Sequence, residues 1–208
     1  MEQFDRYRQM AVDLLANEKT RKAFDVMGAD EKRQEKYGKN AFGWSLLSAA
    51  QLVEAGVSLV QVNLGNNEAW DTHGNAFPNL KNHLLPPMDR AVSALLDDLD
   101  ARGLLKETLI VMGSEFGRTP KINARYGRDH WGTAWSVCLG GAGIVRGGVV
   151  GETNKNGTAV TKDQCDAGHL FHTYLKALGM SSRKHFKIGG QKIPLADPAF
   201  EPIKKLLI

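Results

Sequence analysis

The chain has 208 residues, which is enough to bury a hydrophobic core and favours a single domain. With 42% hydrophobic and 24% charged residues, the composition is that of a globular protein and excludes a disordered or fibrous chain. The net charge is only +4, and the lysines and arginines are scattered among acids. This pattern predicts a solvated surface and no nucleic-acid-binding stripe.

No run of residues approaches the ~18 apolar positions of a transmembrane helix, so the sequence predicts no membrane span. The first residues, MEQFDRYRQM, are charged and lack the apolar segment of a signal peptide. The two cysteines, Cys138 and Cys165, do not form the closely spaced pair that binds a metal. These features do not distinguish one cellular compartment or oligomeric state from another.

The first quarter of the chain is predicted to be helical. Residues 5–24 are rich in helix-forming residues, and a second helix over residues 43–56 ends at Gly56, a residue suited to the position after a C-cap. Residues 57–64, VSLVQVNL, are apolar and β-branched over the length of a strand. The polar loop 65–83 follows.

The remaining elements alternate between helix and strand. A long amphipathic helix over residues 86–103 begins with prolines and ends at a glycine. After it we expect a strand at 107–114, a loop at 115–132, a strand at 134–143, a glycine-rich turn region at 143–151, a helix at 167–179, and a short hairpin with a last helix in the tail. This alternation predicts an α/β fold with a largely parallel sheet between helices on both faces.

Two loops of this predicted sheet carry acids and histidines. In an open α/β sheet, ligands bind beyond the carboxyl ends of the strands. The loop after residues 57–64 contains Asp71 and His73, and the loop after the next strand contains Glu115 and His130. We therefore expect these side chains to converge on one edge of the sheet.

The sequence AWDTHGN places Asp71 and His73 two residues apart. Alternate residues of an extended segment point to the same side, so both side chains could bind one ion. A mixture of imidazole and carboxylate ligands suits zinc, manganese or iron. The alternative is an ordinary polar loop, because an aspartate in a loop often caps its own backbone. The two pairs together strengthen the metal interpretation, and the residues alone leave both alternatives open.

Two arginines stand beside these groups. Arg118 and Arg128 could bind a phosphate or sulfate oxyanion, or they could simply pair with Glu115 or Asp129. Glu115 is equally open: it could be a metal ligand, a residue that orients a histidine ligand, or a salt-bridge partner.

Other chemistry is weakly indicated. His169 and His172 lie three apart on the predicted helix 167–179, where surface histidines without a ligand role are common. The sequence contains no G-x-S-x-G motif, so no serine nucleophile is marked.

Several long motifs are similar to one bacterial family. The segments VEAGVSLVQVNLGNNEAWDTHGN, GSEFGRTPKI, GRDHWG and GAGIVRGGVVGET resemble the uncharacterised family called domain of unknown function fifteen-zero-one. The resemblance extends over nearly the whole chain. That family is assigned to the alkaline phosphatase and sulfatase superfamily.

The resemblance implies a three-layer α/β/α sandwich with a metal centre, and a hydrolase acting on phosphate or sulfate esters, either small molecules or polysaccharides. Asp71 and His73 resemble the acid and histidine of one metal site, and His130 in GRDHW resembles the histidine that completes it. Glu115 stands where many relatives carry Asp-His for a second ion, whereas this chain has Glu115-Phe116.

The resemblance also implies that residues 1–208 are the C-terminal part of a single sulfatase-like domain. Relatives are usually exported and about twice as long, and their N-terminal half holds the nucleophile. On this basis we expect an incomplete sandwich that is inactive alone. The alternative is a non-catalytic binding or structural module that retains the fold.

Overall fold

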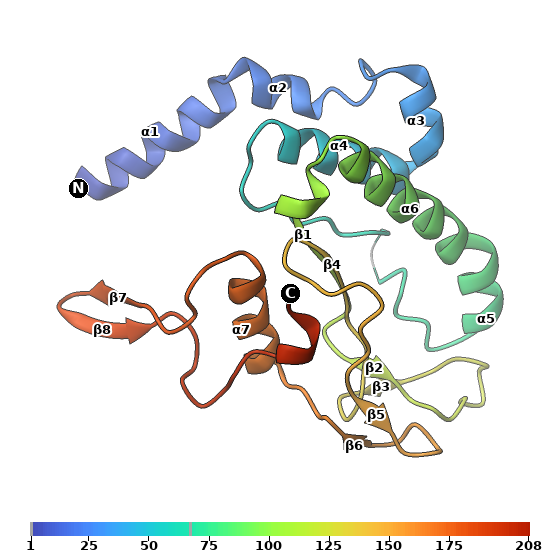
Figure 1. Ribbon diagram of the computed structural model, residues 1–208. Helices are drawn as coiled ribbons and strands as arrows, with labels where there is room; N and C mark the ends of the chain where they lie inside the picture. Colours follow the sequence, from blue (N-terminus) through green and yellow to red (C-terminus); the bar gives the residue numbers. More distant parts are fainter. Residues whose placement is uncertain (1, 67) are drawn as a thin grey trace. The chain divides into compact units, whose positions relative to one another are not determined.

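The computed structural model describes residues 2–66 and 68–208. The chain divides into two compact units, residues 1–102 and residues 103–208. In Figure 1 the first unit runs from blue to green and the second from green to red. None of the described helices combines the length and the hydropathy needed to cross a bilayer.

The first unit is helical. Its elements are α1 Glu2–Ala16, α2 Glu18–Phe24, α3 Glu31–Tyr37, α4 Ala41–Glu54, α5 Ala76–Asn79, the π-helical turn η1 Leu80–Leu84 and α6 Leu85–Ala101. Side-chain oxygens of Asn17, Asp30 and Asn40 accept hydrogen bonds from the free amides that start α2, α3 and α4. Gly56 follows the C-cap of α4 with φ +91°, so the predicted role of this glycine is confirmed.

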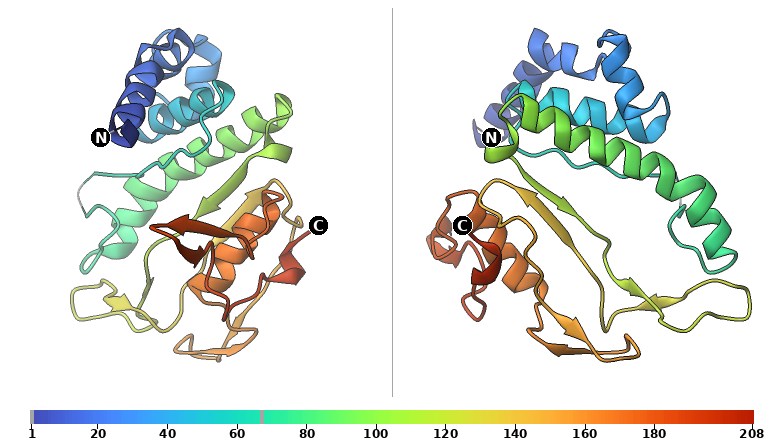
Figure 2. Two further views of the ribbon diagram at one scale, coloured as in Figure 1. Left: turned by 90° about the vertical axis from the view of Figure 1, so that its left-hand side faces the viewer. Right: turned by 45° about the vertical axis from the view of Figure 1, so that its right-hand side comes forward.

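Helices α4 and α6 pack side by side and form the core of the first unit, as Figure 2 shows. Leu47 and Ala50 of α4 are buried, and so are Leu95 and Leu99 of α6. The two leucines of α6 are four residues apart and therefore lie on one face of the helix. The amphipathic helix predicted over residues 86–103 is thus confirmed as α6.

An ionic network around Asp98 ties α3 to α6. The Asp98 carboxylate accepts hydrogen bonds from Arg33 Nε at 2.9 Å, the Tyr37 hydroxyl at 2.9 Å and Arg102 Nε at 2.9 Å. The Asp98 side chain is only 12% exposed, and Tyr37 is fully buried. Burial alone would raise the pKa of Asp98, but the bonds from Arg102, Arg33 and Tyr37 outweigh it and lower that pKa.

The second unit contains the strands. They form four two-stranded antiparallel pairs: β1 Leu109–Met112 with β4 Cys138–Gly141, β2 Gly117–Arg118 with β3 His130–Trp131, β5 Glu152–Thr153 with β6 Val160–Lys162, and β7 His185–Ile188 with β8 Gln191–Pro194. The helices of this unit are the 3₁₀ turn η2 Leu105–Glu107, α7 Ala167–Ala177 and the 3₁₀ turn η3 Lys204–Leu206. The last helix expected in the tail is therefore a single 3₁₀ turn.

The predicted three-layer α/β/α sandwich with a largely parallel sheet is wrong for this structure. Residues 57–64 are extended but join no described ladder, and Leu59 is 87% exposed. The next predicted strand, β1, pairs antiparallel with β4. Parallel neighbours need a crossover connection, usually a helix, whereas turns and short strands join Met112 to Cys138. The chain therefore returns antiparallel.

Helix α7 carries a histidine that is fully buried. Nε2 of His172 lies 2.8 Å from the carbonyl oxygen of Asp197, and Nδ1 lies 2.6 Å from Ser182 Oγ. Because a carbonyl can only accept, Nε2 carries the proton and Nδ1 accepts from the serine hydroxyl. His172 thus joins α7 to two later segments, and the expectation of a surface histidine fails here.

Candidate metal centre

The loop with Asp71 and His73 is anchored to the first unit by Trp70. The indole Nε1 of Trp70 donates a 2.6 Å hydrogen bond to the carbonyl of Leu64, and its ring meets Phe42 of α4 edge to face at 6.4 Å between centroids. An aromatic ring combined with a hydrogen bond fixes the direction of the backbone that follows. Trp70 therefore positions the segment that carries Asp71 and His73.

Successive tight turns place the Asp71 and His73 side chains together. The amide of Thr72 donates to the carbonyl of Trp70 at 2.9 Å, and the amide of His73 donates to the carbonyl of Asp71 at 2.9 Å. Such bonds between residues i and i+2 are those of γ-turns. The predicted proximity of the two side chains is found, although tight turns bring it about instead of a simple extended chain.

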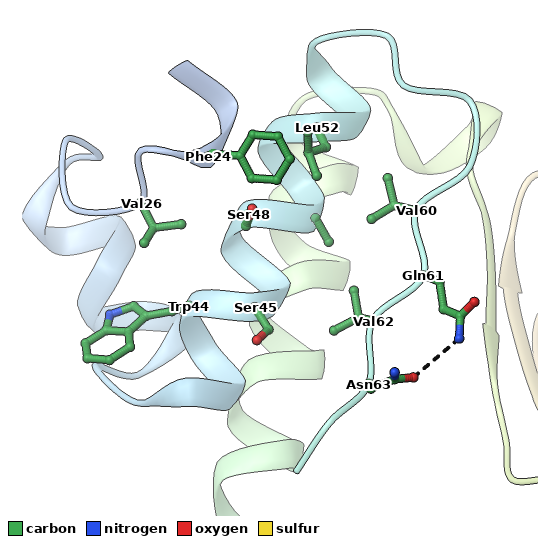
Figure 3. Close-up of a pocket in the computed structure, with 11 residues that line it drawn as sticks. Phe24, Val26, Trp44, Ser45, Ser48, Leu52, Val60, Gln61, Val62 and Asn63 are labelled. Atoms are coloured by element: carbon green, nitrogen blue, oxygen red, sulfur yellow. Dashed lines mark hydrogen bonds between the residues drawn. The ribbon is translucent and has the colours of Figure 1, made fainter. Parts of the chain in front are cut away.

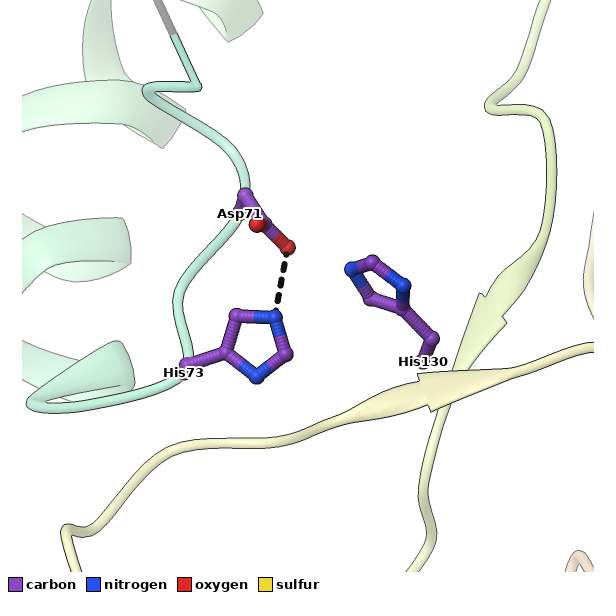
Figure 4. A group of neighbouring side chains, drawn as sticks. All are labelled: Asp71, His73 and His130. Atoms are coloured by element: carbon purple, nitrogen blue, oxygen red, sulfur yellow. Dashed lines mark ion pairs between the residues drawn. The ribbon is translucent and has the colours of Figure 1, made fainter.

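Asp71 and His73 are in direct contact. His73 Nε2 lies 3.1 Å from Asp71 Oδ1, and both side chains are about one-third exposed (33% and 30%). Figure 4 draws this ion pair as a dashed line and also shows His130 on its strand. Two donors bound to one tetrahedral zinc ion at ~2.0–2.2 Å lie roughly 3.3 Å apart. The pair therefore already has nearly the spacing that two ligands of one ion need.

His130 belongs to the second unit and lies on a short strand, not in the open loop that the sequence predicted. Strand β3 pairs with β2, which sets His130 opposite Arg118. The His130 ring lies against Phe116, with 4.3 Å between ring centroids and a tilt of 41°. Phe116 thus contacts the histidine of the GRDHW motif.

The segment between β2 and β3 is held by its own polar groups. Asn123 Oδ1 accepts from the amides of Arg125 and Gly127 at 2.9 and 3.0 Å, while its Nδ2 donates to Asp129 Oδ1 at 3.0 Å. The Thr119 amide and the Asp129 carbonyl bond at 2.9 Å. These hydrogen bonds join the two ends of the segment, and His130 follows directly after its last residue, Asp129.

The two arginines contribute to the same segment. Arg128 Nη1 donates to the carbonyls of Thr119 and Pro120 at 2.7 and 2.6 Å, and Arg118 Nη1 donates to the carbonyl of Arg128 at 3.4 Å. The guanidinium carbon of Arg118 also lies 5.8 Å from the centre of the Phe116 ring. Both arginines therefore hold the loop. Their predicted part in substrate binding stays a prediction.

In the part of the chain that the structure describes, one group of acidic and histidine side chains could hold a metal ion: Asp71, His73 and His130. Each offers one donor atom, an imidazole nitrogen or a carboxylate oxygen. The set suits zinc or manganese. Glu115 is exposed and is not one of the three, so its proposed ligand role gains no support.

A concave feature of the first unit lies beside α4. It is an open groove of about 420 Å³ between α4 and residues 60–63. Figure 3 shows Val60 and Val62 pointing toward the helix. Its remaining lining residues are Phe24, Val26, Trp44, Ser45, Ser48, Ala49, Leu52, Gln61 and Asn63. None of these side chains is an acid, a base or a histidine, so the groove offers no acid–base or metal chemistry.

Comparison with known proteins places the chain in a family. The model of the family described as "Protein of unknown function (DUF1501)" matches residues 1–207, and the chain belongs to that family. The family expected from the sequence motifs is thus confirmed. No curated protein and no solved structure matches the chain.

Proposed function

We propose that this protein binds a divalent metal ion through Asp71, His73 and His130, and that its chemistry is that of a metal-dependent hydrolase of phosphate or sulfate esters. The observation that carries the proposal is the 3.1 Å approach of His73 Nε2 to Asp71 Oδ1. A neutral imidazole and a carboxylate are ligands of the type that a zinc or manganese site uses. His130 adds a third donor of the same kind.

The chain's own residues have separate roles in this proposal. A bound ion would polarise an ester oxygen and lower the pKa of an attacking hydroxyl or water. Asp71, His73 and His130 bind the ion, while Trp70 keeps the first two in register. Arg118 and Arg128 are the cations available for a phosphate or sulfate oxyanion. The choice of phosphate or sulfate esters as substrates rests on the resemblance of the loop motifs to the alkaline phosphatase and sulfatase superfamily.

A titration of metal-free protein with zinc or manganese, followed by calorimetry, tests the metal part of the proposal. We expect one ion per chain for the unaltered protein and a loss of affinity of at least ~100-fold for His130→Ala. His83→Ala is the matched control, because His83 is an exposed histidine on η1. Absence of uptake, or equal affinity in the two variants, would refute the metal site.

A second candidate function is a metal-binding module without catalysis. The hydrogen bonds of Arg128 to the carbonyls of Thr119 and Pro120 favour it, because they occupy part of a guanidinium that would otherwise bind substrate. Assays of the metal-loaded chain with aryl phosphate and aryl sulfate esters separate the two candidates. Turnover that disappears in Asp71→Ala supports the hydrolase, whereas metal binding without turnover supports the module.

A further inference from the structure

The hairpin β7–β8 of the second unit has one apolar face and one basic face. Its register pairs Phe186 with Ile193 and Lys187 with Lys192. Residues directly opposite each other in an antiparallel pair point to the same face, and successive residues alternate between faces. Phe186, Ile188 and Ile193 therefore share one face, with Gln191 opposite Ile188 at its end.

The apolar face of the hairpin is open to solvent. Phe186 is 44% exposed and Ile188 is 60% exposed, while Ile193 is half-buried. Figure 1 shows the two strands projecting from the region of α7. The turn is made by Gly189 and Gly190, both with positive φ, and this favours a tight connection. A two-stranded hairpin is marginally stable alone, so a surface that covers this apolar face would stabilise it.

The opposite face of the hairpin is basic. Lys187 and Lys192 stand directly opposite each other, and like charges in that position repel. His185 shares their face, and Lys184 precedes the strand. No acidic residue occurs from position 183 to position 196. Arg183 is different, because it bonds to Glu201 and to the carbonyls of Pro198 and Phe200 and so anchors the base of the hairpin.

We propose that the hairpin β7–β8 binds the surface of a bilayer that contains anionic lipid. Charge complementarity selects the lipid: the phosphate layer matches Lys184, Lys187 and Lys192, and the acyl boundary accepts Phe186, Ile188 and Ile193. Lysine side chains can extend from a buried apolar stem to reach the phosphates. A nucleic acid would match the lysines but would gain little from the aliphatic side chains Ile188 and Ile193.

Flotation of the full chain with vesicles tests this proposal. We expect binding to phosphatidylcholine vesicles that contain phosphatidylserine, and little binding to phosphatidylcholine alone. Lys187→Ala and Lys192→Ala should each weaken binding about fivefold, which corresponds to roughly 1 kcal/mol for a lysine near an anionic surface. Phe186→Ser should weaken it at least ~10-fold. Lys155→Ala, an exposed lysine in another loop, should bind like the unaltered chain.

The outcomes are distinct. All these residues are exposed, so circular dichroism should show that each variant folds. Loss of binding in both the lysine and Phe186 variants supports the proposal. Absence of vesicle binding, or binding that does not depend on phosphatidylserine, overturns it. So does binding to a single-stranded oligonucleotide that needs the lysines but not Phe186, because that result assigns the basic face to nucleic acid.

Discussion

Asp71 and His73 meet across a single intervening residue, with 3.1 Å between Oδ1 and Nε2. The same two atoms are the donors that we assign to the proposed metal ion. In the proposed site, metal binding would replace a contact that already brings both side chains together. Little conformational entropy remains to be lost when the ion binds.

Substitution of Asp71 by Asn tests the charge of this donor with almost no change of shape. We expect zinc affinity to fall about 10- to 100-fold, because the amide oxygen is a weaker ligand for a divalent ion than a carboxylate. Calorimetric titration measures the change. The matched control is Asp89→Asn, at an exposed position of α6. Equal affinities in both variants would contradict a ligand role for Asp71.

Trp70→Phe separates positioning from ligation. The variant keeps a ring against Phe42 but loses the 2.6 Å hydrogen bond to the carbonyl of Leu64. We expect zinc affinity to fall several-fold, with a loss of about 1 kcal/mol in the free energy of unfolding. Chemical denaturation and the metal titration measure the two effects. Trp135→Phe is the control, and an equal loss of affinity in that variant would show that the effect is not local.

Asp98→Asn should destabilise the first unit strongly. Asp98 accepts bonds from Arg33, Tyr37 and Arg102, and bonds to a charged group contribute about 1.5–3 kcal/mol each. We expect a loss of about 3 kcal/mol in the free energy of unfolding, measured with urea at neutral pH. The neighbouring Asp97, whose pair with Lys36 is exposed, provides the control Asp97→Asn with a loss below about 1 kcal/mol.

The same carboxylate predicts a pH dependence. The folded-state pKa of Asp98 lies below its ordinary value of about 3.9, so its contribution is complete above that value and decreases as pH falls through the folded pKa. The stability difference between the unaltered protein and Asp98→Asn should therefore shrink below about pH 4. Urea denaturation over a series of pH values measures it. A difference that stays constant down to low pH would show that Asp98 has no depressed pKa.

Ser182→Ala tests the buried histidine of α7. The variant removes the hydroxyl that donates to His172 Nδ1 at 2.6 Å, and it leaves a buried acceptor without its partner. We expect a loss of about 1–3 kcal/mol in the free energy of unfolding. Ser181→Ala, at an exposed neighbouring position, should change stability by less than about 0.5 kcal/mol. Equal effects of the two substitutions would argue against the hydrogen bond.

Helices α4, α6 and α7 could be predicted from the sequence. In contrast, the predicted helix 5–24 is divided into α1 and α2, and residues 76–83 of the predicted loop 65–83 lie in α5 and η1. The spacing of Leu95 and Leu99 identifies the buried face of α6, and Gly56 marks the end of α4. Both signals are local, since a helix is stabilised by residues three and four apart and by its own caps. The proximity of Asp71 and His73 could also be predicted, because one residue separates them in the sequence.

Strand pairing and the surroundings of single side chains depend on contacts between distant residues. The composition of residues 57–64 and of β1 indicates strands, but it does not say whether a ladder forms or in which direction it runs. The burial of His172 could not be predicted from the local sequence, because its hydrogen-bond partners Ser182 and Asp197 lie 10 and 25 residues further along the chain. Local sequence therefore predicted α4, α6, α7 and the Asp71–His73 pair. Long-range packing set the antiparallel pairing, the short strand that carries His130 and the exposed faces of the hairpin.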